Sequence, residues 1–163
     1  MNYCWVRRGE RKRIPYESPQ GRRVNVLAVV DVDGPVSALH WVGYAGTWRG
    51  EHLVRLCEEL LDGPLAMAVP TVIVLDNASY HHARVVRDAL PALAERGLTL
   101  FYLPPYSPKL NAIERVFRAI KHTRLPERRY ATLGALQTAV DDAFDAHERH
   151  LIAKSTPQPR LAA

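Results

Sequence analysis

The sequence predicts an α/β fold, in which a mixed β-sheet is flanked by helices. Two apolar runs separated by a turn signal predict a β-hairpin in the first third of the chain. Further along, an apolar run, a helical stretch and a second apolar run have the spacing of a βαβ unit, so these two strands should lie parallel. The 163 residues suit one domain, expected over 1–150, with a flexible tail at 151–163.

The hairpin is expected from two strands and the turn between them. The run "VNVLAVVD" (24–31) is continuous, apolar and β-branched, which is typical of a strand buried on both faces. The sequence "DGP" (33–35) predicts a turn, and "VSALHWVGY" (36–44) predicts the returning strand.

A helix is expected next, at 49–62, and Gly63 and Pro64 should end it. Apolar residues recur there at helical spacing and predict one buried stripe, formed by Leu53, Leu56, Cys57, Leu60 and Leu61. Cys57 is therefore expected in the core. Cys4 and Cys57 lie far apart and lack the paired spacing of a zinc site.

The βαβ unit is expected from "TVIVLD" (71–76), a helix at about 82–96 and "LTLFYL" (98–103). Pro91 lies inside the helical stretch and should kink or interrupt it, because proline cannot donate the backbone hydrogen bond. Gly97 should end the helix.

Two further helices are expected, at 111–124 and 133–148. The second has an apolar face formed by Leu133, Leu136, Val140 and Phe144. No apolar run approaches the ~20 residues that a membrane-spanning helix needs, and we expect a cytoplasmic protein.

The charge is basic and clustered. Lys and Arg number 22 against 17 Asp and Glu, for a formal charge of +5. One cluster comprises Arg7, Arg8, Arg11, Lys12, Arg13, Arg22 and Arg23. The other comprises Arg115, Arg118, Lys121, His122, Arg124, Arg128 and Arg129. Such clusters attract polyanions, although a solvated basic surface explains charge alone equally well.

Two carboxylates are candidates for a metal site. Asp76 ends a predicted strand at its carboxyl end, where open α/β sheets place their sites. Glu114 begins a predicted helix just after the next strand. Carboxylates that converge at one sheet edge repel each other unless a cation lies between them, and oxygen ligands favour Mg²⁺ or Mn²⁺. A basic surface around them suggests nucleic-acid phosphates as the substrate.

Each carboxylate also has a structural explanation. Asp76 and Asn77 together are typical of a turn that leaves a strand. Glu114 follows Asn111 by three residues, the spacing of a capping box, in which it would accept a hydrogen bond at the helix start.

Four other side chains have a chemical and a structural interpretation. His81 and His82 are possible ligands, although adjacent histidines at a helix start are more often surface residues. Trp41 and Trp48 are expected to pack in the core rather than to stack on nucleobases.

Two long motifs resemble those of one family. The segment "VIVLDNASYHHA" resembles the Asp-Asn-Ala-x-x-His signature of DDE transposases, in the bacterial insertion-sequence branch related to mariner. The segment "FYLPPYSPKLNAIERVFRAIK" is similar to the motif that carries the last carboxylate of that family. "YCWVRRGERKRIPY" and "RRVNVLAVVD" match the segment between the family's first two acids, so the resemblance covers about 3–125.

The resemblance implies a ribonuclease-H-like fold in which three acids hold two Mg²⁺ (or Mn²⁺) ions. It implies that this site cuts the element ends and then joins them to target DNA. It implies that Asp76 is the second acid and Glu114 the third, supported by Asn77, His81 and Asn111. A homodimer in a synaptic complex on DNA is expected from the family. Lys121 lies seven residues after Glu114 on about the same helical face, and we expect it to meet phosphates with Arg115 and Arg118.

The sequence departs from the family at the first acid, which lies on a strand upstream of the segment that starts here at Tyr3. We therefore expect the chain to be truncated and to lack this central strand, its Asp and the DNA-binding region before it. Asp31 and Asp33 match the hairpin and are expected to be turn residues. Without the central strand, the runs 24–31 and 71–76 lose their shared partner.

Three hypotheses follow. The chain is the catalytic domain of a transposase, active if upstream sequence or a partner supplies the rest. Alternatively, it is an inactive remnant that binds only DNA or intact transposase. A basic nucleic-acid-binding module unrelated to transposition fits the charge but leaves both motifs unexplained.

Overall fold

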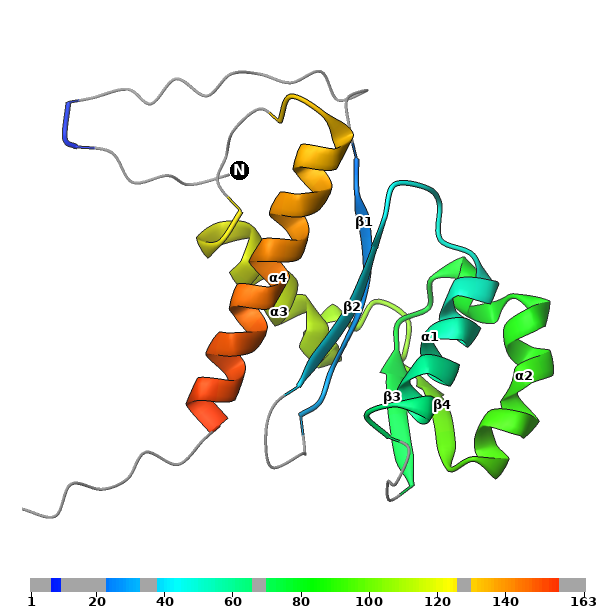
Figure 1. Ribbon diagram of the computed structural model, residues 1–163. Helices are drawn as coiled ribbons and strands as arrows, with labels where there is room; N and C mark the ends of the chain where they lie inside the picture. The colour runs from blue at the N-terminus through cyan, green and yellow to red at the C-terminus, as the bar shows by residue number, and fades with distance from the viewer. Residues whose placement is uncertain (1–6, 10–22, 33–37, 66–69, 126–129, 156–163) are drawn as a thin grey trace, which may run out of the picture. The chain divides into compact units, whose positions relative to one another are not determined.

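The computed structural model describes residues 7–9, 23–32, 38–65, 70–125 and 130–155. The chain divides into two compact units, Met1–Ala45 with Val116–Ala163, and Gly46–Arg115. The described strands form two two-stranded sheets, which agrees with the expectation of a mixed sheet whose shared central strand is missing (Figure 1). No helix of the described ranges combines the length and the apolar character that spanning a membrane requires.

In the first unit, β1 (Asn25–Val30) and β2 (Leu39–Tyr44) pair antiparallel, which confirms the hairpin. The backbone N–H of Asp31 donates to the carbonyl of Ala38 and extends this pairing, as expected for a residue next to the turn. The turn itself, at 33–37, lies outside the described residues. Most of β1 is only partly buried, so the expectation of burial on both faces was wrong.

Helix α4 (Leu133–Ser155) packs on β2 through aromatic side chains. Trp41 stacks on Phe144 with ring centroids 5.7 Å apart, and Phe117 meets the same ring edge-on at 6.0 Å. Trp41 is thus a packing residue, as predicted. A Cβ at Gly43 would meet the amide end of the Gln137 side chain on α4, so a larger residue here would require that side chain to change its conformation.

Helix α4 is longer than its apolar pattern predicted. It continues through 151–155, which we expected to belong to a flexible tail, because alanine and lysine extend a helix well without an apolar face. Residues 156–163 lie outside the described part of the chain.

In the second unit, β3 (Thr71–Leu75) and β4 (Leu98–Tyr102) pair parallel, which confirms the βαβ prediction. The connection consists of the short 3₁₀ helix η1 (Ser79–His82) and helix α2 (Arg84–Glu95). Gly97 has φ = 86° directly after α2 and ends it, as predicted.

Helix α2 runs through Pro91 without interruption, contrary to one of the two predicted outcomes. Pro91 is exposed, and the carbonyl that loses its partner belongs to Arg87, which is also exposed. Water can satisfy that carbonyl, while Val86 and Leu93 are buried and hold the helix in place.

Helix α1 (Gly50–Asp62) packs against α2 with the predicted apolar stripe buried. Cys57 is completely buried, and burial, together with the charge of Glu58, raises the pKa of its thiol to about 11. It is an unreactive core residue, as expected. Trp48 contacts His52 edge-on at 5.1 Å and serves packing.

One face of the β3–β4 sheet remains open. Ile73 and Leu75 are buried, but Val72 and Val74 on the opposite face are 58% and 45% exposed. The apolar run 71–76 predicted a buried strand, and only one face of β3 is buried. Neither β1 nor β3 has a second strand partner within the described residues.

Candidate metal and DNA site

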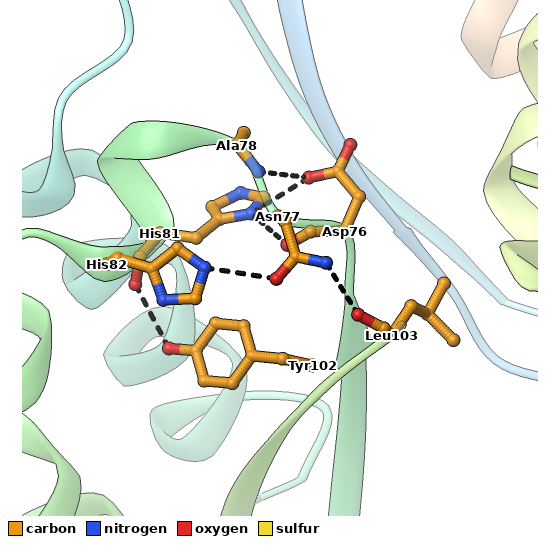
Figure 2. Close-up of polar contacts among 7 residues, drawn as sticks. All are labelled: Asp76, Asn77, Ala78, His81, His82, Tyr102 and Leu103. Atoms are coloured by element: carbon orange, nitrogen blue, oxygen red, sulfur yellow. Dashed lines mark hydrogen bonds and ion pairs between the residues drawn. The ribbon is translucent and has the colours of Figure 1, made fainter. Parts of the chain in front are cut away.

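Asp76 directly follows β3, at the carboxyl end of the strand, and begins the candidate site (Figure 2). One carboxylate oxygen, Oδ1, accepts a hydrogen bond from the backbone N–H of Ala78 at 3.0 Å. This is the turn that the structural explanation predicted. The carboxylate is nevertheless 54% exposed, and its second oxygen, Oδ2, accepts no hydrogen bond from the described residues. Asp76 therefore forms a turn and keeps one oxygen for a ligand.

The buried side chain of His81 contacts Asp76. Its Nδ1 lies 3.0 Å from the Asp76 carbonyl oxygen and 3.0 Å from Oδ1 of the same residue. Both oxygens are acceptors, so Nδ1 carries the ring proton. The side chain is only 4% exposed, and its Nε2 has no hydrogen-bond partner among the described residues. A proton on Nε2 would be a buried donor without an acceptor, which again favours the Nδ1–H tautomer.

The adjacent histidines thus differ from each other. His82 is exposed, as expected of a surface residue, whereas His81 is buried, contrary to that expectation. The tight turn of η1 places one ring under Asp76 and the other beside Asn77.

Asn77 links the ends of the two strands. Its Nδ2 donates to the carbonyl oxygen of Leu103, just after β4, at 2.6 Å. The backbone N–H of Leu103 donates to the Leu75 carbonyl at 2.8 Å and continues the parallel pairing. The Asn77 side-chain oxygen, Oδ1, lies 3.2 Å from Nε2 of His82. These contacts fix the backbone on both sides of Asp76.

Tyr102 completes the network and was not identified from sequence. Its hydroxyl donates to the carbonyl of His81 at 3.0 Å, and its ring stacks on that of His82 with centroids 4.6 Å apart (Figure 2). Burial raises the pKa of Tyr102, so the hydroxyl stays protonated as a donor. Tyr102 is the last residue of β4 and lies opposite Leu75. A polar side chain near the end of the predicted strand 98–103 was the signal in the sequence that could have identified it.

Glu114 lies in the first turn of α3 (Ala112–Thr123). Its backbone N–H donates to the Asn111 carbonyl at 3.2 Å, but no side-chain hydrogen bond joins the two residues. The capping box offered as its structural explanation is not formed. The carboxylate is exposed, and within the described ranges neither a hydrogen bond nor an ion pair joins it to Asp76. No three His, Cys, Asp or Glu side chains of those ranges form a metal-binding cluster.

Helix α3 exposes a basic face. Val116 and Ile120 are buried, whereas Arg115, Arg118 and Lys121 are exposed. None of these three cations forms an ion pair with another residue of the described chain. Of the first basic cluster, only Arg7, Arg8 and Arg23 fall within the described residues, and Arg128 and Arg129 lie outside them.

The chain resembles known transposase structures in fold. It superposes on the chain in the Mos1 strand transfer complex with a TM-score of 0.61 at 19% identity, covering 94% of this chain and 45% of that one. A Mos1 transposase paired-end complex with the left transposon end gives a TM-score of 0.62 at 19% identity, covering 94% and 46%. The Mos1 mariner paired-end complex with Mn gives a TM-score of 0.59 at 20% identity, covering 93% of this chain and 45% of that one.

The fold is thus an α/β fold similar to the ribonuclease-H-like catalytic domain of Mos1 transposase. The chain spans less than half the length of these Mos1 chains. No curated protein matches its sequence. The family model for the DDE superfamily endonucleases matches residues 1–137, which include Asp76, Glu114 and the network around them. The chain belongs to the DDE superfamily endonuclease family.

Proposed function

We propose that the chain is the catalytic domain of a DNA transposase that cuts element ends and joins them to target DNA. The observation that supports this most directly is the state of Asp76: contacts with His81 and Ala78 fix its position, while its side chain is 54% exposed and Oδ2 accepts no hydrogen bond from the described residues. The turn itself needs only the contact with Ala78, so it does not account for the contact with the buried imidazole. Membership of a DDE endonuclease family gives this carboxylate a chemical use.

The donors present suit Mg²⁺ or Mn²⁺. Asp76 offers one unused carboxylate oxygen, and Glu114 offers an exposed carboxylate at the start of α3. Hard oxygen donors with water in the remaining positions are what Mg²⁺ prefers. We assign Asp76 and Glu114 as the residues that hold the divalent ions, with Asn77, His81 and Asn111 in support. When bound, the ions supply Lewis-acid stabilisation of the pentacovalent phosphate and lower the pKa of the attacking hydroxyl.

The proposed reaction has two displacements at phosphorus. In cleavage, a water oxygen attacks the phosphorus and the P–O3′ bond breaks, leaving a 3′-hydroxyl and a 5′-phosphate, with one proton released. In strand transfer, that 3′-hydroxyl attacks a target phosphate, and the target's own P–O3′ bond breaks. Asp76 must keep its orientation through both steps, which the contacts from His81 and Ala78 ensure.

DNA is the proposed partner. Arg115, Arg118 and Lys121 on the exposed face of α3 are assigned to phosphates flanking the cleaved bond. Two element ends must be brought together for transposition, so we propose that the chain works in a homodimer on paired ends. The neighbouring Mos1 structures include two paired-end complexes, which supports this arrangement.

Nicking of supercoiled plasmid with Mg²⁺ or Mn²⁺ tests the proposal. We expect Asp76→Asn and Glu114→Gln each to lower the rate at least 100-fold, because each variant removes a charge that holds the ions. Asp88→Asn is the matched control, since Asp88 is exposed on α2 and its ion-pair partner among the described residues is Arg84 on the same helix. Nicking that survives in Asp76→Asn, or that proceeds in EDTA, contradicts the assignment.

A second candidate is a transposase remnant that binds DNA, or intact transposase, without cutting. The exposed cations of α3 are compatible with it, because binding DNA phosphates needs no bound metal. DNA binding by the wild-type chain without metal-dependent nicking selects this candidate.

A further inference from the structure

Tyr106, on the loop between β4 and α3, is 101% exposed, more than any other large apolar side chain in the described residues. Its backbone has φ = 58°, and within those residues no other non-glycine residue has a positive φ. Bulky side chains rarely occupy this left-handed region, because it brings Cβ close to the backbone. A ring that touches no core cannot offset that strain by packing. The folding of the chain thus gives no reason for an aromatic residue here.

The loop presents this ring on a rigid frame. Pro104, Pro105 and Pro108 restrict the backbone on both sides of Tyr106. The hydroxyl of Ser107 donates to the Pro105 carbonyl at 3.3 Å, and the 3₁₀ helix η2 (Pro108–Leu110) follows directly. A side chain that is already held in place loses little conformational entropy when it binds a ligand.

The ring also lies near the candidate metal site. The loop starts at Leu103, whose carbonyl accepts the hydrogen bond from Asn77, the neighbour of Asp76. Tyr106 follows Leu103 by three residues, which span at most about 11 Å even when fully extended. A DNA strand whose phosphate lies at Asp76 therefore passes within reach of Tyr106.

The charge of this segment indicates what binds to the ring. From Leu103 to Ile113 the sequence contains no acid, and Lys109 is exposed. Helix α3 follows with the exposed cations Arg115, Arg118 and Lys121. An exposed aromatic ring beside cations is the combination with which proteins bind single-stranded nucleic acid, since cations meet phosphates and the ring stacks on a base.

We propose that Tyr106 is a stacking platform for an unpaired nucleobase of the DNA strand bound next to Asp76. In an intact duplex both faces of a base are covered by its neighbours, so only an unpaired or terminal base offers a face to the ring. This inference rests on the proposed function in taking DNA as the substrate. It adds that the DNA is locally unpaired where the loop meets it.

The test uses two duplexes of the same length, one fully paired and one carrying a single unpaired 2-aminopurine. Binding of the wild-type chain is expected to quench the 2-aminopurine fluorescence, as stacking on an aromatic ring does. Tyr106→Ala is expected to abolish this quenching and to weaken binding of the bulged duplex roughly tenfold, with the paired duplex unaffected. Tyr106→Phe should retain both, because its ring is the same size. Lys121→Ala should weaken both duplexes equally.

Tyr106→Gly separates stacking from folding. Glycine accepts a positive φ without strain, so this variant is expected to unfold at the same temperature as wild type or higher, while losing the quenching. Quenching that persists in Tyr106→Gly, or equal quenching by wild type and Tyr106→Ala, would show that the ring touches no base. Either result overturns the stacking role, and metal-dependent nicking by wild type would leave the proposed function intact. A wild-type chain that binds neither duplex overturns both.

Discussion

The imidazole of His81 donates one N–H to two oxygen atoms of the same residue, the carbonyl and Oδ1 of Asp76. This contact restricts both the backbone and the carboxylate of Asp76. His81 does not itself reach a ligand, because it is buried. We therefore interpret it as a positioning residue whose effect on metal binding passes through Asp76.

His81→Asn and His81→Gln test that role. The side-chain amide of asparagine lies close to the position of Nδ1, whereas that of glutamine lies closer to Nε2, so only asparagine can replace the donor to Asp76. We expect the Mn²⁺ dissociation constant, measured by titration calorimetry, to rise about tenfold or more in His81→Gln and less in His81→Asn.

Thermal unfolding of the same two variants provides the control. Both leave space where the ring was, and both should lose some stability. If Mn²⁺ affinity falls equally in the two variants and follows the loss of stability, His81 serves packing alone, and the positioning role is wrong.

The sequence identified part of this site and missed the rest for a physical reason. Asp76 and Asn77 were identified because a polar pair at the end of an apolar strand is a local pattern. The role of Tyr102 depends on a contact over 21 residues with His81 and on its stacking with His82, which form only when the two strands are parallel and in register. Single-chain periodicity contains no information about that register.

At the scale of elements, close packing of α1 against α2 depends on Gly50. A Cβ at this position would lie 2.7 Å from a Val85 methyl group and 2.8 Å from Cβ of Ala83, closer than carbon atoms approach. Gly50→Ala is therefore expected to lower the free energy of unfolding by about 1–3 kcal/mol, because the two helices must move apart. Urea unfolding followed by circular dichroism measures the change.

Gly134→Ala is the matched control for Gly50→Ala. Gly134 also lies in the first turn of a helix, but a Cβ there would meet only the Thr132 hydroxyl, at 3.9 Å. Alanine favours the helix over glycine, so this variant should gain a few tenths to about 1 kcal/mol. Opposite signs for the two substitutions support the packing argument, and stabilisation by both would contradict it.

Helix α1 was predicted to within one residue because its apolar stripe, Gly63 and Pro64 are all local signals. The continuity of α2 through Pro91 was not predicted. The helix-breaking tendency of proline is a local property of the sequence, whereas the packing that overrides it comes from the rest of the unit.

At the scale of the whole molecule, the apolar runs predicted the strand pairs but not how the pairs combine. The expectation that 24–31 and 71–76 lack a shared partner came from the family resemblance, and the two described sheets agree with it. Apolar runs marked all four described strands, and turn length and the βαβ spacing predicted which of them pair within each unit. Whether β1 and β3 share a partner depends on long-range pairing, for which these runs contain no signal. The described strands remain in two sheets, with an open edge on each.

The pH dependence of stability is expected to reflect His147, which is buried on α4. Burial, and then the positive charges of Arg124, His150 and Lys154, lower the pKa of His147 below its usual 6.5. The unfolded chain therefore takes up this proton more readily than the folded one. The contribution of His147 to stability is complete above about pH 6.5 and is lost as the pH falls through that value.

His147→Gln removes this titration but keeps a polar side chain in place of the ring. In the wild-type chain the Arg124 Nε–H donates to Nδ1 of His147 at 3.5 Å. We expect the wild-type chain to lose stability between about pH 7 and pH 5 more steeply than the variant, by up to about 1.4 kcal/mol per pH unit. Urea unfolding at a series of pH values gives both slopes. His122→Gln is the control, because His122 is exposed on α3 and its charge is not among those that lower the pKa of His147. Identical slopes for wild type and His147→Gln would show that another group controls acid stability, since only a proton bound differently by the folded and unfolded chains can change the free energy of unfolding with pH.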